Sequence, residues 1–162
     1  MNKIQIIVNN GAGTGSAVAV WKETKEYLQE NEISYNAYLT RYEKHAVKLA
    51  GQICGKIPEG PIYLLVVGGD GTINEVLNGI TDFDRVRLGV IPTGSGNDFA
   101  RNLGILRNTR EDLQEITACI DQEQNGEKLQ RIDLGKVSWE GCEKPRIFGI
   151  SAGAGLDAIV CK

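Results

Sequence analysis

The chain has 162 residues and a formal net charge of −3, with 41% hydrophobic and 24% charged residues. This composition is typical of one globular domain, and the acidic balance argues against nucleic-acid binding. No apolar run has the length of a transmembrane helix, and the run at 4–8 is too short for a signal peptide. Scattered cysteines without CxxC spacing and a single histidine do not indicate a zinc site. We therefore expect a cytoplasmic protein, with at most a peripheral position at a membrane.

Strands alternate with helices along most of the chain. Residues 62–67 are apolar throughout, as expected of a central parallel strand that is covered on both faces. Capping-box patterns at 40–43, 72–75 and 109–112 predict the starts of three helices. The alternation predicts an α/β fold with a parallel sheet between helices. The predicted strands are 4–8, 33–39, 62–67 and 87–91, and the predicted helices are 16–30, one after 40–43, 72–80, 98–103 and one from 109.

The pattern changes after the last of these helices. Residues 121–128 are polar and contain an Asn-Gly turn, and 129–139 and 145–150 then read as two strands without a helix between them. We expect the α/β domain to span 1–128 and a second architecture to begin at 129–162. Unpaired strand edges invite pairing with another chain, so the exposed edges of 129–151 predict a possible homo-oligomer.

Three glycine-rich loops each follow a predicted strand, at 9–15, 68–72 and 92–97. The carboxyl ends of parallel strands meet at one edge of a sheet, where ligands bind. The turn at 68–72 can hold phosphates at a helix N-terminus, and Asp70 in it has no obvious packing role. The chain lacks a Walker A sequence and a GxGxxG loop, which disfavours a dinucleotide site. A phosphate or nucleotide site at this edge is the resulting hypothesis.

Two of these loops resemble a known family. The sequences GGDGTINE at 68–75 and PTGSGNDFAR at 92–101 are similar to the two signatures of the diacylglycerol kinase catalytic-domain family of lipid kinases, which includes sphingosine and ceramide kinases. Three weaker elements are also similar: Thr40 with His45 and Ala46, residues 132–135, and residues 155–158.

The resemblance implies a three-layer α/β sandwich like that of phosphofructokinase and NAD kinase, and transfer of the ATP γ-phosphate to a hydroxyl of diacylglycerol or a related lipid at the membrane surface. ATP and Mg²⁺ are the implied cofactors. Asp70 is the implied catalytic residue; it would reach Mg²⁺ through water or accept the lipid hydroxyl's proton. The implied nucleotide-binding residues are Asn9, Asn10, Gly11, Gly13, Thr40, Gly68, Gly69, Gly71, Thr72, Asn74, Glu75, Gly94, Ser95, Asn97 and Asp98.

The residues themselves leave simpler roles open. Asp70 can cap a turn or a helix, and Glu75 can complete a capping box instead of binding ribose. Asn97 and Asp98 can fix their loop and start its helix. Arg101 can pair with phosphate or with Asp98.

The chain departs from the family at two places. The first loop lacks the usual proline and serine, so a hydroxyl contact is lost at Ala12. Family members also carry a β-sandwich second domain, of which 129–162 would be only the start. Two other functions therefore stay open: an NAD-kinase-like soluble kinase, because NAD kinases share the GGDGT turn, and a nucleotide-binding module without catalysis.

Overall fold

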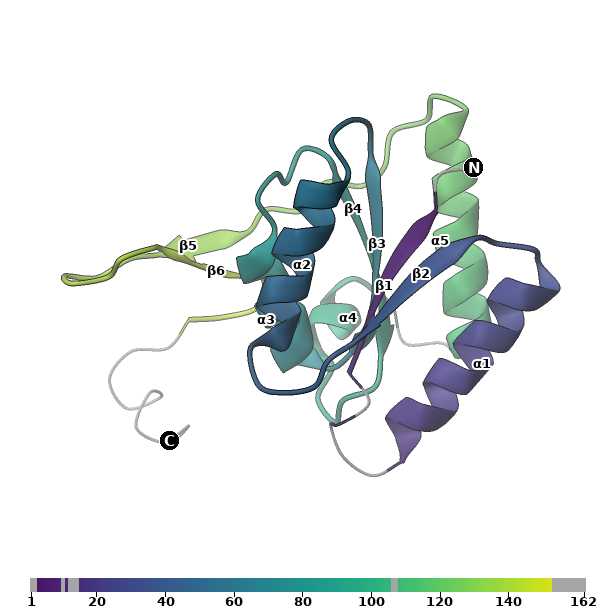
Figure 1. The fold of residues 1–162 in the computed structure, drawn as a ribbon, viewed down its shortest axis with the longest axis horizontal. Coiled ribbons are helices and arrows are strands. Elements are labelled where there is room, and N and C mark those ends of the chain that lie inside the picture. Colours follow the sequence, from purple (N-terminus) through teal and green to yellow (C-terminus); the bar gives the residue numbers. More distant parts are fainter. Residues whose placement is uncertain (1–2, 10, 12–14, 106–107, 153–162) are drawn as a thin grey trace.

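A four-stranded parallel sheet lies at the centre of the fold (Figure 1). The computed structural model describes residues 3–9, 11, 15–105 and 108–152. Every residue of the two central strands is buried, which explains their continuous apolar sequences. The register aligns the carboxyl ends, since Val8 pairs with Val67 and Gly68 pairs with Pro92. In sheet order the strands are β2 (Tyr35–Leu39), β1 (Ile4–Val8), β3 (Ile62–Gly68) and β4 (Val86–Pro92).

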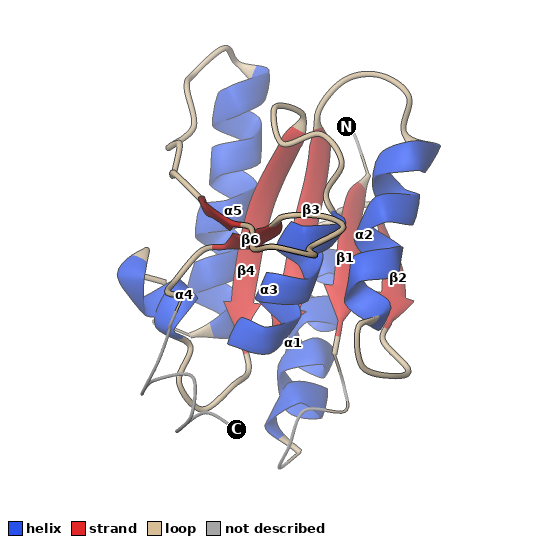
Figure 2. Ribbon diagram, turned by 90° about the vertical axis from the view of Figure 1, so that its left-hand side faces the viewer, coloured by secondary structure: helices blue, strands red, loops and turns tan. Residues whose placement is uncertain are grey.

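Helices cover both faces of this sheet (Figure 2). One face carries α2 (His45–Lys56), α3 (Asp70–Gly79) and the short α4 (Asp98–Asn102), and the other carries α1 (Ser16–Glu30) and α5 (Thr109–Gln124). Helices α2 and α3 approach so closely that a Cβ on Gly79 would lie 2.1 Å from the carbonyl oxygen of Val47. On the other face, Arg110 forms a bidentate ion pair with Glu30, at 2.8 and 3.0 Å. The expected α/β sandwich is confirmed.

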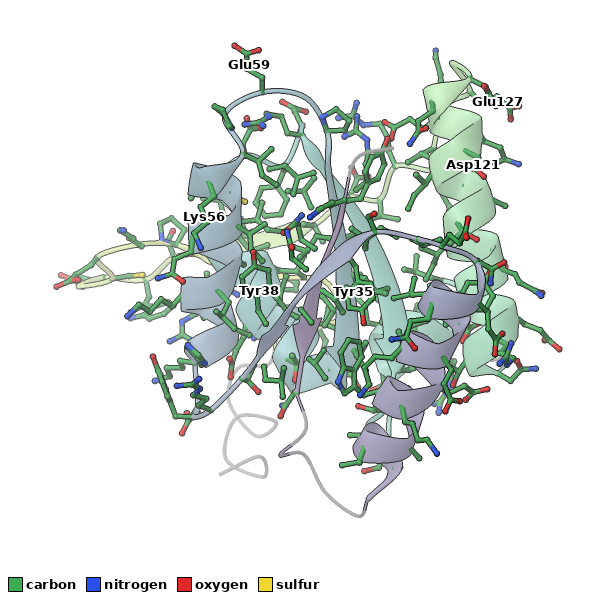
Figure 3. The ribbon with its side chains drawn as sticks, turned by 45° about the vertical axis from the view of Figure 1, so that its right-hand side comes forward. Tyr35, Tyr38, Lys56, Glu59, Asp121 and Glu127 are labelled. Carbon is green, nitrogen blue, oxygen red and sulfur yellow. The ribbon has the colours of Figure 1, made fainter. Side chains whose placement is uncertain are left out.

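Helix α2 also covers the edge strand β2. Lys56, in the last turn of α2, places its ammonium 5.8 Å from the ring centre of Tyr38 on β2 (Figure 3). This contact spans the layer between the helix and the sheet and is a cation–π arrangement. Glu59, in the loop that follows, points away from the body of the molecule in the same view and is exposed.

An antiparallel hairpin of β5 (Gly135–Val137) and β6 (Arg146–Phe148) projects from the side of the sandwich (Figure 1). Its base is joined to α3 by the side-chain amide of Asn78. The Asn78 Nδ2 donates to the carbonyl of Ile147 at 2.8 Å, and the amide of Ile147 donates to the Asn78 Oδ1 at 2.9 Å. Two hydrophobic residues of the hairpin remain largely exposed, Val137 at 37% and Trp139 at 57%.

Several predicted helix starts were wrong. Helix α2 begins at His45 after the N-cap Lys44, not at 40–43, and α3 begins at Asp70, not at 72. The predicted cap of α5 is displaced by one residue, because the side chain of Asn108 accepts the amide of Glu111. A capping-box pattern identifies residues able to cap, but the cap that forms depends on where tertiary contacts fix the helix.

The later boundaries also differ from the sequence prediction. Helix α5 continues to Gln124, through the first part of the predicted polar linker. The predicted strands 129–139 and 145–150 shorten to three residues each. A strand needs a paired neighbour, and between residues 129 and 150 of the described chain only these two three-residue segments pair with each other.

Candidate functional site

The carboxyl ends of the four strands form one continuous row. The residue that follows each of three strands donates a backbone hydrogen bond to the neighbouring strand: Thr40 to Val8 at 2.9 Å, Asn9 to Val67 at 2.9 Å, and Thr93 to Gly68 at 3.1 Å. These bonds align the loops that follow the strands. The predicted shared edge is therefore present for the described parts of the loops.

The two signature loops pack against each other through glycine. A Cβ on Gly69 would lie 3.1 Å from the Cα of Gly94, and a Cβ on Gly94 would lie 3.0 Å from the Cα of Gly69. A Cβ on Gly68 would lie 2.7 Å from the Cβ of Thr72. These three glycines are thus explained by packing between and within the loops. Gly71 differs, because a Cβ there would meet nothing within 4 Å.

Asp70 joins the same two loops by hydrogen bonds. Its Oδ2 accepts the amide of Asp98 and its Oδ1 accepts the amide of Phe99, both at 3.0 Å. Asp70 lies in the first turn of α3, and the two donors are the first residues of α4. The carboxylate therefore caps a helix from outside it, and its orientation is fixed. Each oxygen still has capacity for a further contact.

The loop before α4 is also held from within. The side chain of Asn97, which has a left-handed backbone (φ 52°), accepts the Gly94 amide at 2.9 Å and donates to the Gly94 carbonyl at 2.6 Å. Arg101 donates to the carbonyl of Gly96 at 2.9 Å and lies 3.4 Å from Asp98. Asn97 and Arg101 thus both stabilise the loop through hydrogen bonds to its backbone. Ser95, between Gly94 and Gly96, is exposed.

Glu75 caps α2 and not its own helix. Its Oε1 accepts the amide of Lys44 at 3.0 Å, and its Oε2 accepts the amide of Ala46 at 3.1 Å. The predicted capping box of Thr72 with Glu75 is therefore wrong. A carboxylate at a helix N-terminus interacts favourably with the helix dipole. Glu75 thus fixes the segment that connects β2 to α2.

A cleft of about 360 Å³ lies beside this segment, at the ends of β1 and β2. The Asn9 Nδ2 donates to the Thr72 Oγ1 at 2.8 Å, and the Asn9 Oδ1 accepts the Gly11 amide at 3.0 Å. Asn9 therefore links the cleft to the glycine turn of α3. The lining residues are Asn9, Gly11, Thr40, Arg41, Tyr42, Glu43 and Glu75.

Most of the predicted site residues lie either in this cleft or in the adjoining loops. Asn74 does not: it is exposed on α3, where its Oδ1 lies 3.4 Å from the Asn78 Nδ2, toward the hairpin. Asn10 and Gly13 lie outside the described residues, as do Ala12 and the element at 155–158. The sequence prediction missed Arg41, Tyr42 and Glu43 as cleft residues. Their position directly after a predicted strand was the available signal.

Asp70 is a carboxylate that could hold a cation beside a phosphate bound at the start of α3. Mg²⁺ in phosphoryl-transfer sites is held by one or two carboxylates, water and the phosphates themselves. One fixed carboxylate with free acceptor capacity fits that donor set. Within the described ranges, no group of three or more His, Cys, Asp or Glu side chains is placed to hold a metal ion.

The sheet, its covering helices and the cleft define an α/β domain with a cleft at the carboxyl edge of its strands, the edge at which ligands bind in such folds. Across the described residues, none of the helices is both long and apolar enough to cross a membrane. The chain belongs to the diacylglycerol kinase catalytic domain family, whose sequence profile matches residues 3–137.

Individual relatives agree with this assignment. The Bacillus subtilis (strain 168) protein named "Putative lipid kinase YtlR" is 32% identical over 96% of this chain and 48% of its own length. A diacylglycerol kinase of the same organism is 41% identical over 58% of this chain and 30% of its own length. A crystal structure of a diacylglycerol kinase from Bacillus anthracis str. Sterne superposes with a TM-score of 0.59 at 30% identity, covering 72% of this chain and 39% of that one. The chain thus spans about half the length, or less, of these relatives.

Proposed function

We propose that this chain is the ATP-binding half of a lipid kinase, which transfers the ATP γ-phosphate to a hydroxyl of diacylglycerol or a related lipid. The single observation that carries the proposal is the open space at Gly71. Packing explains Gly68, Gly69 and Gly94, but nothing within the described fold occupies the position of a Gly71 side chain. That space lies at the N-terminus of α3, where backbone amides favour an anion.

The nucleotide would lie along the edge of the sheet. Its phosphates would contact the turn at 69–72, and the exposed hydroxyl of Ser95 would donate from the neighbouring loop. The remainder of the nucleotide would extend past Asn9 into the cleft by Thr40 and Glu75. Glu75 itself supports the wall of the cleft through two backbone amides, so its contribution to nucleotide affinity is mainly indirect.

Asp70 would provide the fixed negative charge next to the phosphates. Mg²⁺, when bound with ATP, neutralises the charge that develops on the transferring phosphoryl group. The two amide hydrogen bonds from α4 keep the Asp70 carboxylate in one orientation, so the cation would find its acceptor already in position. Positioning of this kind is the main contribution of protein groups to phosphoryl transfer.

The acceptor is a lipid at a membrane surface in this proposal, because the family and its named relatives are lipid kinases. The hairpin after residue 128 would then belong to a second unit that is more complete in the longer relatives. The exposed Val137 and Trp139 would be covered either by that unit or by a second copy of the chain. Sedimentation of the purified protein at several concentrations tests the second possibility.

A nucleotide-binding module without catalysis is the second candidate, because the two amide hydrogen bonds that Asp70 accepts also fit a purely structural role as a cap of α4. One experiment separates the two. The protein is incubated with γ-labelled ATP and Mg²⁺, with either dioleoylglycerol in detergent micelles or NAD as acceptor, and ATP binding is measured by calorimetry in parallel.

The kinase proposal is supported if the wild-type chain transfers label to the lipid, if Asp70→Asn abolishes this transfer, and if Asp84→Asn does not. Asp84 is a matched control because it is exposed and lies far from the cleft, at the opposite edge of the sheet. ATP binding without transfer to either acceptor supports the binding module. Label in NAD, or no ATP binding, contradicts the proposal.

A further inference from the structure

Tyr42 presents the one broad aromatic surface among the described residues of the cleft. The other lining side chains are polar or charged, apart from a glycine. Large aromatic side chains usually bury most of their area, yet Tyr42 is 59% exposed. An exposed ring at the wall of a cleft has a surface available for another flat group.

The ring is held in place by its neighbours. It stacks on the imidazole of His45, with ring centres 4.3 Å apart and planes at 24°. The His45 Nδ1 accepts the amide of Arg41 at 3.1 Å, and the His45 amide donates to the carbonyl of Tyr42 at 3.2 Å. Because one bond fixes the His45 imidazole and the other fixes the His45 backbone, the aromatic platform is ordered before any ligand arrives.

The backbone that carries the ring is fixed as well. Glu75 holds the amides of Lys44 and Ala46, which follow Tyr42 in the chain. Lys44 has a left-handed backbone (φ 64°), so the chain reverses sharply there. Segment 40–44 therefore forms an ordered side of the cleft, and its conformation depends on the Glu75 carboxylate of α3.

We propose that Tyr42 stacks on the base of the bound nucleotide; this rests on the proposed function and adds the residue that recognises the base. Tyr42 follows β2 and Gly71 follows β3, with β1 between them. Neighbouring strands are about 4.8 Å apart, so the ends of β2 and β3 lie roughly 10 Å apart along the edge of the sheet. Asn9, between them, lines the cleft and contacts the α3 turn. The nucleotide thus has its base at β2 and its phosphates at β3.

A ring that stacks on the base affects ATP and tripolyphosphate differently, whereas a ring that only supports the loop affects both alike. Stacking on an aromatic ring contributes to binding of any base, because every base has a π-face, and it contributes nothing to a phosphate chain alone. The affinity for ATP should therefore depend on Tyr42, whereas the affinity for inorganic tripolyphosphate should not. GTP should lose affinity together with ATP.

The test is calorimetric titration of the chain with ATP, GTP and tripolyphosphate, each with Mg²⁺. We expect Tyr42→Ala to raise the Kd for ATP about 5- to 150-fold, which corresponds to about 1–3 kcal/mol for one stacked base. The Kd for tripolyphosphate should not change. Tyr42→Phe should bind ATP as the wild type does, and Tyr42→Leu, which keeps apolar bulk without a ring, should be intermediate. Phe83→Ala is the matched control, since Phe83 is 42% exposed and precedes β4 at the opposite edge.

Three results would overturn the inference, and they are distinguishable. Wild-type ATP affinity in Tyr42→Ala refutes the stacking and leaves the proposed function standing. An equal loss for ATP and tripolyphosphate shows that Tyr42 supports the loop and does not bind the base. A wild-type chain that binds none of the three ligands refutes the proposed function and the inference together.

Discussion

Removal of the Glu75 carboxylate tests whether this residue of α3 caps the N-terminus of α2. The two amides it accepts are not equivalent, because Lys44 is exposed and Ala46 is fully buried. In Glu75→Ala, water can replace the first bond, but the second amide loses its partner in a part-buried position. Leaving such a donor unsatisfied costs about 1–3 kcal/mol, and loss of the charge at the helix N-terminus adds about 0.3–1 kcal/mol. The higher helix propensity of alanine offsets a few tenths of a kcal/mol, so we expect the free energy of unfolding to fall by about 2 kcal/mol.

Thermal unfolding measures this loss. For a domain of this size, 1 kcal/mol shifts Tm by about 2–4 °C, so Glu75→Ala should melt about 4–8 °C below the wild type. Glu75→Gln keeps one acceptor and should lose about half as much. Glu59→Ala is the matched control: Glu59 is exposed in a loop, so its change should stay within about 0.5 kcal/mol. Hydrogen exchange at the Ala46 amide should accelerate in Glu75→Ala. Equal melting of Glu75→Ala and Glu59→Ala would refute the cap.

Three further predictions follow from particular residues. Gly71→Ala has no steric obstacle, so its free energy of unfolding should stay the same or rise by up to about 1 kcal/mol, while its Kd for ATP increases. In Gly79→Ala the new Cβ would meet the Val47 carbonyl, so the free energy of unfolding should fall by about 1–3 kcal/mol. Lys44→Gly relieves a left-handed backbone and should raise the urea midpoint, by up to about 1 kcal/mol in unfolding free energy; an unchanged or lower midpoint would contradict this. Burial raises the pKa of Tyr63 above 10.0, so the unfolded chain releases this proton first and stability falls as pH rises above about 10. The urea midpoint of Tyr63→Phe should therefore fall less than that of the wild type between about pH 9 and about pH 11, and an equal fall would contradict the assignment.

The sheet could be predicted from the sequence because its signal is local. The apolar runs of β1 and β3 are long enough to require cover on both faces, and the glycine loops follow directly from them. The residues that bind ligands at such an edge are therefore placed approximately by topology alone.

The bonds that shape the site could not be predicted in the same way. Asp70 accepts amides 28 and 29 residues further along the chain, and Glu75 accepts amides 31 and 29 residues earlier. A local capping-box pattern accounts for Glu75 equally well, and only the packing of α2 on α3 decides between the two. Tyr42 was missed for a related reason, since residues 40–43 fit a helix start and were assigned to one.

Amide chemical shifts recorded while ATP and Mg²⁺ are added test the central claim most directly. The account predicts that the largest shifts occur at 69–72, 93–95 and 41–44, because these segments surround the proposed nucleotide position. Amides at 59–60 and 83–85, at the opposite edge of the sheet, should not move. Saturable shifts confined to the opposite edge, or no saturable shift at any concentration of ATP, would contradict the account.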